Sequence, residues 1–403
     1  MTTFLQLHLL TSYPPACLNR DDLNRPKSAK LGGVDRLRIS SQSLKRAWRV
    51  SDVFREQLSG ETGIRSKELG RKIKEAMLTG IPLTELLVPS HRTAEPDDQV
   101  TEKNANEWAW MIAAEYVNKK VKGGEEEGEP DEIGVDDRAK KKDKKVAKSN
   151  ISKETLKSEQ IVFYSQNEIQ ALDGLIHILR ETKTQAPSAQ QLAQIKIKAA
   201  PRTVDLAMFG RMLASSPDYN VEAACQVAHA ITVHRAAVED DFFTAVDDLN
   251  TREEDAGSAH LGEQGFGAGL FYQYVCIDCD RLRENLNSDA ALTGRAIQAL
   301  IEAAATVAPT GKQNGFASRA WAYYALAEKG SRQPRALSLA FIKPVREGDM
   351  LNEAVSALTS MRDNLDKVYY KGAALDSRSI NATTGVGDFE ALKTWAADCG
   401  GEA

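Results

Sequence analysis

Apolar and polar side chains alternate over the first residues of the chain. Between residues 4 and 10, Leu5, Leu7 and Leu9 fall on one side and the polar residues Gln6 and His8 fall on the other. An alternation with a period of two is typical of a β-strand that buries one face and leaves the other in water. The pattern therefore predicts a half-buried strand over Phe4–Leu10.

The periods of strands and helices predict further elements along the chain. Further strands are expected at Arg36–Ile39, Gln160–Ser165, Gly269–Asp278 and Ala336–Val345. Helices are expected at Ser40–Arg55, Lys67–Leu78, Lys103–Val121, Asn167–Arg180, Val204–Met212, Ser288–Val307 and Asp388–Ala397. Ser288 or Asn287 is the expected N-cap of the helix that follows them. The run Val221–His234 fits a helix or a strand.

The helix expected at Ser40–Arg55 carries two opposite faces. At about 100° per residue, one stripe is polar and cationic and the other is suited to a core. The cationic stripe consists of Gln42, Lys45, Arg46 and Arg49, and the opposite stripe consists of Leu44, Ala47, Trp48 and Ser51. A solvated helix face normally interleaves glutamates, and none lies between Arg36 and Arg55. Since the free N–H groups of the first turn also attract anions, phosphate contact is the better interpretation.

Basic residues are concentrated in one segment of an acidic protein. The formal net charge is −5, but residues 18–50 carry nine basic and three acidic side chains, which makes this segment +6 and the remainder −11. The basic residues are Arg20, Arg25, Lys27, Lys30, Arg36, Arg38, Lys45, Arg46 and Arg49. A basic patch on an acidic body is typical of a protein that grips a phosphate backbone at one place.

A charged insertion interrupts the chain at Lys119–Asn150. An acidic run precedes a basic one, and almost nothing apolar is available to bury. This composition is typical of a solvated, disordered segment. A loose contact of its lysines with nucleic acid is left open.

Two strand-like arms, Val238–Leu249 and Ala259–Gly269, flank a polar stretch at Asn250–Ser258. An extended hairpin that carries Phe242, Phe243 and Leu261 could wedge between bases, because an aromatic face supports any base. A hairpin buried against its own domain explains the pattern equally well. The glycines between residues 262 and 269 lack the spacing of a dinucleotide-binding loop and are interpreted as places where the chain turns tightly.

Groups that would support catalysis or bind a metal are not gathered in any motif. Cys276 and Cys279 form a lone C-x-x-C pair without the second pair that a zinc site requires. The six histidines are dispersed, and the patterns of hydrolases and phosphate-binding loops do not occur. We therefore expect a protein that needs no metal or cofactor and is not an enzyme.

Composition places the chain among ordinary globular proteins. Of its 403 residues, 42% are hydrophobic and 27% are charged. No apolar run approaches the ~20 residues that span a bilayer, and the first residues lack the pattern of a signal peptide. We expect a cytoplasmic protein without membrane association.

Several stretches of the sequence are shared with a known family. In chain order they are N-R-D-D at 19–22, G-G at 32–33, R-I-S-S-Q-S-L-K-R-A at 38–47, F-G-R-M-L at 209–213, V-E-A-A at 221–224, Q-V-A-H-A-I-T at 226–232, F-T-A-V-D-D-L at 243–249, H-L-G at 260–262, the run 266–274 and G-E-A at 401–403. With these stretches, which cover about a third of the chain, the sequence resembles the CasC family. These are the backbone proteins of type I-E CRISPR Cascade complexes, within the RAMP superfamily.

The resemblance implies an α+β fold. It consists of a modified ferredoxin-like (RRM-like) palm, a helical fingers insertion and a β-hairpin thumb. On this basis, residues 1–58 form the first part of the palm with the basic helix. Residues 59–200 form the fingers, including the disordered loop 119–150, and residues 201–403 complete the palm, with the thumb at about 235–268.

The resemblance also implies a function. The chain would be a non-catalytic subunit that polymerises along CRISPR RNA and presents the guide for pairing with target DNA in antiviral defence. Each thumb would kink the guide and flip one base. The implied partners are CRISPR RNA, target DNA in the guide–target heteroduplex, further copies of the chain in a helical filament, and the large, small, 5′-end-capping and 3′-hairpin-binding subunits of Cascade.

Site residues are carried over by position. The expected RNA-binding residues are Arg20, Lys27, Arg38, Ser40, Ser41, Gln42, Lys45, Arg46, Arg49 and Lys312, and the expected base wedge consists of Met212, Phe243 and Leu261. Two departures from the family are the size of the insertion and the sequence of residues 311–324, which drifts around Lys312. The alternative function is a RAMP-type ribonuclease that uses a loop aspartate, such as Asp21, Asp22 or Asp35.

Overall fold

The structure is a computed structural model that describes residues 2–87, 95–97, 99–117, 154–158, 161–195, 203–213, 220–245, 260–346 and 348–401. The chain forms two compact units, which we describe separately. The first unit comprises residues 1–62, 207–209 and 223–403, and the second comprises residues 63–206 and 210–222. The sequence had placed the boundaries after residues 58 and 200. The charged segment Lys119–Asn150 and the polar stretch Asn250–Ser258 lie outside the described residues.

An antiparallel sheet forms the centre of the first unit. Its strands follow the order β11-β10-β1-β9-β7-β3-β2, and β6 and β8 also pair with β9. The strands are β1 (Phe4–Ala16), β2 (Ser28–Leu31), β3 (Val34–Ile39), β6 (Cys225–Val227), β7 (Ala230–Thr232), β8 (Glu239–Ala245), β9 (His260–Asp278), β10 (Ala322–Gly330) and β11 (Asp376–Asn381). The expected α+β class is confirmed, and the open run Val221–His234 contains strands rather than a helix.

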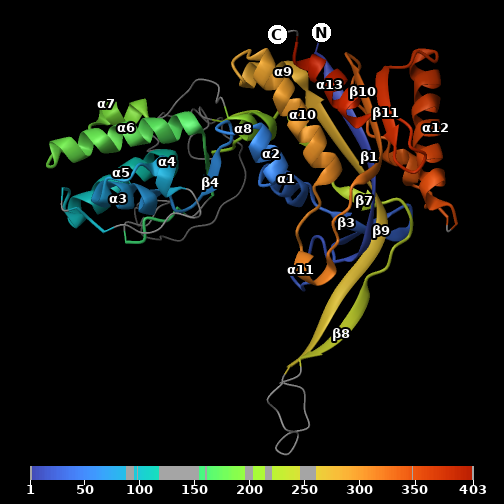
Figure 1. The fold of residues 1–403 in the computed structure, drawn as a ribbon, viewed down its shortest axis with the longest axis horizontal. Coiled ribbons are helices and arrows are strands. Elements are labelled where there is room, and N and C mark those ends of the chain that lie inside the picture. Colours follow the sequence, from blue (N-terminus) through green and yellow to red (C-terminus); the bar gives the residue numbers. More distant parts are fainter. Residues whose placement is uncertain are drawn as a thin grey trace, which may run out of the picture. The chain divides into compact units, whose positions relative to one another are not determined.

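Helices cover both faces of this sheet. The helices of the first unit are α1 (Ser41–Arg49), α2 (Asp52–Gln57), α9 (Cys279–Asn285), α10 (Ala290–Thr306), α11 (Gln313–Phe316), α12 (Met350–Tyr370) and α13 (Phe389–Ala397), with 3-10 turns η2 (Ser338–Phe341) and η3 (Asp398–Gly400). Helix α8 (Val204–Phe209) lies where the chain passes between the units. Helices α10 and α12 lie on opposite sides of the sheet (Figure 1).

Strand β1 is buried on both faces, so the prediction of a half-buried strand is wrong. Gln6 is 1% exposed and His8 is 0% exposed. Their face is covered by α12, whose Ala354 and Leu358 pack in one cluster with Leu10 of β1. A helix that the strand pattern does not predict therefore turns the expected solvent face into an interior.

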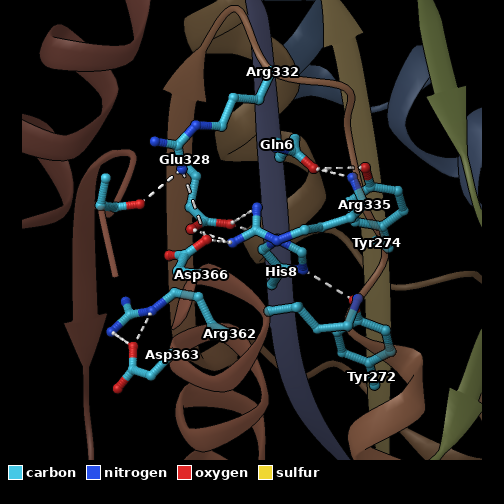
Figure 2. Close-up of polar contacts among 12 residues, drawn as sticks. Gln6, His8, Tyr272, Tyr274, Glu328, Arg332, Arg335, Arg362, Asp363 and Asp366 are labelled. Carbon is cyan, nitrogen blue, oxygen red and sulfur yellow. Dashed lines mark hydrogen bonds and ion pairs between the residues drawn. The ribbon is translucent and has the colours of Figure 1, made fainter. Parts of the chain in front are cut away.

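The buried polar residues of β1 are accommodated by a network of hydrogen bonds and ion pairs (Figure 2). Gln6 Oε1 accepts from the backbone N–H of Arg335 at 2.6 Å. His8 Nε2 faces a carboxylate oxygen of Glu328 at 3.3 Å. Arg335 also pairs with Asp366 of α12 at 3.1 Å. The network thus ties α12 to the sheet that it covers.

Strand β9 runs on from the sheet into an antiparallel hairpin with β8, which we call the hairpin arm (Figure 1). Its glycines do not make tight turns, contrary to the sequence interpretation. They lie within the strand, where neighbours approach closely. A Cβ on Gly265 would meet Pro26 at 3.1 Å, one on Gly267 would meet Leu37 at 2.7 Å, and one on Gly269 would meet Thr232 at 2.5 Å.

Three local predictions in the first unit need correction. The helix expected at Ser40–Arg55 is two helices, because Ser51 ends α1 and caps α2 through the backbone N–H of Phe54. The N-cap of α10 is Asp289, which accepts from Leu292 at 2.9 Å. Residues 336–345 form no strand. They contain η2, and the backbone N–H of Leu337 donates to the Tyr272 hydroxyl instead of to a neighbouring strand.

The second unit is mainly helical. It contains α3 (Leu69–Thr79), α4 (Leu83–Leu86), α5 (Glu102–Val117), α6 (Gln166–Thr182), α7 (Ala189–Gln194) and a two-stranded sheet of β4 (Ile64–Ser66) and β5 (Val162–Tyr164). A capping box of Ser165 and Glu168 begins α6. Glu168 also forms a buried ion pair of 2.7 Å with Arg211. None of the helices in the described ranges is apolar over a length that would cross a bilayer.

Candidate nucleic-acid interface

The loop between β1 and β2 is fastened to the start of α1 by Asn19. Its side-chain oxygen accepts from the backbone N–H of Ser40 at 2.8 Å. Its backbone oxygen accepts from the N–H of Lys27, and the Lys27 carbonyl accepts from the N–H of Arg38 at 2.8 Å. Three of the expected RNA-binding residues, Lys27, Arg38 and Ser40, therefore lie around one asparagine.

Helix α1 has the two faces that its sequence predicts. Leu44, Ala47 and Trp48 are buried, whereas Gln42 and Arg46 are exposed. Ser41, Lys45 and Arg49 are half-buried at the margins of the exposed face. The first turn holds no acidic residue, so the partial positive charge of the helix start is not neutralised there.

Ser40 and Lys45 are held by the protein itself. Ser40 is 7% exposed, and its hydroxyl caps α1 by accepting from the backbone N–H of Ser43 at 3.3 Å. Lys45 Nζ lies 5.5 Å from the ring centroid of Phe209, a cation–π distance. Burial raises the pKa of the neighbouring Cys225 thiol to about 12, against an opposing effect of Lys45. The Cys225 thiol therefore stays protonated and carries no negative charge that could pair with Lys45.

Arg38 contacts a residue that the sequence analysis did not select. Its Nη1 lies 2.7 Å from Nδ1 of His229, in the turn between β6 and β7. His229 occurs in the Q-V-A-H-A-I-T stretch shared with the family. Only the fold reveals that this stretch lies beside β3 and Arg38.

Lys312 is brought to the same region by a close backbone contact. A Cβ on Gly311 would lie 2.4 Å from the carbonyl oxygens of Cys17 and Leu18, so only glycine permits this approach. Burial raises the pKa of the Cys17 thiol, and the positive charges of Lys312 and then Arg20 oppose that rise. Both cations therefore lie near the same thiol, although they are almost 300 residues apart in the sequence.

Two basic residues of the segment 18–50 are not available to a ligand. Arg36 is fully buried and donates to the carbonyl oxygens of Thr232 at 3.0 Å and Phe341 at 2.9 Å. Arg25 forms an ion pair of 2.8 Å with Asp240 of the hairpin arm. Apart from Lys30, the remaining cations of this segment are ones that the sequence selected. We call Arg20, Lys27, Arg38, Lys45, Arg46, Arg49 and Lys312 the basic surface.

The three expected wedge residues differ in their surroundings. Phe243 is 43% exposed, and its ring lies over its cross-strand partner Gly262, where a Cβ would approach ring carbons to 2.3 Å. Leu261 pairs with Thr244 in the same ladder, and its side chain lies outside the described part. Met212 is 84% exposed and belongs to the second unit. The hairpin arm thus presents a partly covered aromatic ring, and the neighbouring Phe242 is 67% exposed.

The aspartates considered for nuclease chemistry are not assembled as a metal site. Asp21 Oδ1 accepts from the backbone N–H groups of Leu23 at 3.0 Å and Arg25 at 2.9 Å, which closes a local turn. Over the described ranges, no three histidine, cysteine, aspartate or glutamate side chains gather as metal ligands. Cys276 and Cys279 are buried free thiols.

A comparison with models of protein families identifies the family of this chain. A family model described as "CT1975-like protein" (Cas_CT1975) matches residues 5–396. The chain belongs to the CT1975-like family. A comparison with curated protein sequences found no match.

Solved structures extend this result to three dimensions. A chain of a "CRISPR RNA-guided surveillance complex, pre-nicking" is 27% identical with a TM-score of 0.70, and the match covers 96% of this CT1975-like protein and 95% of that chain. A chain of a second "CRISPR RNA-guided surveillance complex" is 23% identical with a TM-score of 0.52, covering 96% and 92%. At this lower identity the second likeness concerns the fold alone. The CT1975-like protein is thus similar to subunits of CRISPR surveillance complexes over nearly its whole length.

Proposed function

We propose that this protein is the repeating guide-RNA-binding subunit of a type I-E Cascade complex. The observation that carries the proposal is the basic surface, in which residues from the β1–β2 loop, β3, α1 and the residue 312 region come together. Membership of the CT1975-like family and the likeness to a subunit of an RNA-guided complex support it. The guide would be CRISPR RNA, and the complex would include target DNA and the other Cascade subunits.

The basic surface suits a ligand with regularly spaced phosphates. Its cations come from several elements, and the free N–H groups of the α1 start add donors for an anion. Base pairing by the guide would supply the sequence specificity. The hairpin arm, with Phe242 and Phe243 on β8, would act as the thumb that interrupts base stacking.

Lys45→Ala tests the proposal on guide-length RNA. Loss of one phosphate contact from a single strand lowers the slope of log affinity against log salt by ~0.7 per site. We expect this change for Lys45→Ala but not for Lys367→Ala, which removes an exposed lysine from α12. Sedimentation should also reveal assemblies that grow with RNA length. Equal slopes for the native chain and Lys45→Ala would contradict the assignment of the basic surface.

We further propose that the subunit does not cut nucleic acid. Asp21 already accepts two backbone hydrogen bonds, and its turn would have to open before the carboxylate could ligate a metal. Assembled protein and guide should therefore leave a complementary RNA intact in the presence of Mg²⁺. Cleavage that disappears in Asp21→Asn would instead support the ribonuclease alternative.

A further inference from the structure

His229 occupies a fixed position at the edge of the basic surface. It is exposed and lies in the short turn between β6 and β7. The preceding residue, Ala228, donates its backbone N–H to the carbonyl of Tyr274 in β9 at 2.9 Å, which holds this turn on the sheet. The ring is thereby placed 2.7 Å from Arg38 Nη1, measured at Nδ1.

The contact with Arg38 defines the protonation of the ring. A guanidinium can only donate hydrogen bonds, so Nδ1 of His229 must accept. In a neutral imidazole the proton then resides on Nε2. A protonated ring carries a hydrogen on both nitrogens and could not make this contact. The free protein therefore holds His229 in its neutral form.

The charges around His229 act in the same direction. Partial burial lowers its pKa from the ordinary value of 6.5, and the positive charges of Arg38 and Lys27 lower it further. Arg38 approaches from β3, and Lys27 comes from the loop before β2. Both are expected phosphate contacts of the basic surface. A phosphate bound there would neutralise the two charges that disfavour protonation and would add a negative charge nearby.

We propose that His229 takes up a proton when a nucleic-acid phosphate binds beside Arg38 and Lys27, and that it then serves as an additional contact of the bound strand. The inference rests on the proposed function, because it requires RNA at the basic surface. In the free chain Nδ1 accepts from Arg38. In the complex the phosphate receives the Arg38 hydrogen bond, and the protonated ring donates to the same anion.

The direction of the pH effect follows from linkage. The complex binds one more proton than the free protein, so affinity for RNA rises as the pH falls. Each unit by which binding raises the pKa of His229 strengthens binding up to tenfold at low pH. We expect binding about threefold to tenfold tighter at pH 5.5 than at pH 8, at constant salt. Most of this gain should appear as the pH falls through and below the ordinary histidine value.

The test compares three proteins on the same short single-stranded RNA. His229→Gln keeps an oxygen that can accept from Arg38 but has no proton to gain. Its affinity for the RNA should not rise between pH 8 and pH 5.5. His177→Gln is the matched control, because His177 is an exposed histidine on α6 of the second unit. This variant should keep the gain.

Calorimetry provides a second readout. Binding measured near pH 6.5 in buffers of different ionisation enthalpy gives the number of protons taken up. This number should be lower for His229→Gln than for the native chain by about half a proton. If the native chain binds RNA but His229→Gln shows the same pH dependence and proton uptake, the inference is wrong and the proposed function stands. If the native chain binds no RNA, both are wrong.

Discussion

Replacing Glu328 by glutamine should strongly destabilise the first unit. Glu328 is 1% exposed in β10. Its two carboxylate oxygens accept from the two terminal nitrogens of Arg335, each at 3.2 Å, and one of them faces His8 Nε2 at 3.3 Å (Figure 2). An amide has one acceptor oxygen and an NH₂ group, so Glu328→Gln points donors at a guanidinium that can only donate.

The magnitude follows from what remains after the change. Breaking a buried ion pair by removing one partner costs about 3–5 kcal/mol, because the other charge stays buried. Here Arg335 keeps its contact of 3.1 Å with Asp366, and its side chain is 17% exposed. These two features favour the lower end of the range. We expect Glu328→Gln to lower the free energy of unfolding by about 3 kcal/mol.

The same network predicts that acid destabilises the protein. Burial lowers the pKa of His8 below 6.5. The free energy of unfolding that neutral His8 contributes is therefore fully present above pH 6.5, and it is lost as the pH falls through the folded-state pKa. Burial alone would raise the pKa of Glu328, but the hydrogen bond from His8 and the charge of Arg335 outweigh it, and the net shift is downward from 4.5. The carboxylate contribution is therefore lost only below pH 4.5, where the gap between native and Glu328→Gln should narrow.

Urea unfolding followed by circular dichroism measures the difference in free energy of unfolding between the native chain and Glu328→Gln. Glu284→Gln is the control, because the ion pair of Glu284 with Arg281 is 3.3 Å long but largely exposed, and it should contribute below about 1 kcal/mol. A loss for Glu328→Gln no larger than that of the control at pH 7 would refute the reasoning. So would a native stability that increases from pH 7 to pH 5.

Two further predictions concern Gly32 and Phe243. Gly32→Ala should lower the free energy of unfolding by at least about 2 kcal/mol, because the φ of Gly32 is 62°, in the left-handed region, and the new Cβ would lie 1.7 Å from the Ile342 carbonyl oxygen. Gly33→Ala is the control. Its φ is 79° and no atom lies within 4 Å of the new Cβ, so it should lower the free energy of unfolding by only about 1 kcal/mol in the same urea titration. Phe243→Ala, which uncovers Gly262, should shorten assemblies on RNA in sedimentation while shifting the melting temperature little, and the reverse pattern would make Phe243 a core residue of the hairpin arm.

The amphipathic character of α1 could be predicted because its information is local. Leu44, Ala47 and Trp48 repeat at helical spacing, and the structure buries these three residues. The end of the helix was less predictable. Ser51 fits an apolar-face position by angle alone, but its hydroxyl accepts a backbone N–H and begins α2. A serine at position 51 was the sequence signal for the N-cap of a second helix.

The interior face of β1 could not be predicted from β1 itself. An alternating strand indicates one solvated face, and only a second helix decides otherwise. The signal for that helix lay elsewhere in the sequence, since Met350, Ala354 and Leu358 recur every four residues and α12 extends over 21 residues. Gln6 and His8 could then have been interpreted as buried polar groups that need partners.

The candidate site was predictable where its residues are neighbours in sequence and unpredictable where the fold brings distant residues together. Lys45 and Arg46 were identified from one helix. Arg36 was wrongly grouped with them, because charge counting cannot reveal that its side chain is buried under carbonyl oxygens. His229 was missed for the opposite reason, since its partner Arg38 lies 191 residues away.

The loop between β1 and β2 has two structural roles, and together they connect the basic surface with the hairpin arm. Asn19 fixes the loop to the start of α1, where the phosphate contacts are proposed. Further along the same loop, Arg25 pairs with Asp240 of β8, and Pro26 lies against Gly265 of β9. One short loop therefore contacts both α1 and the base of the hairpin arm.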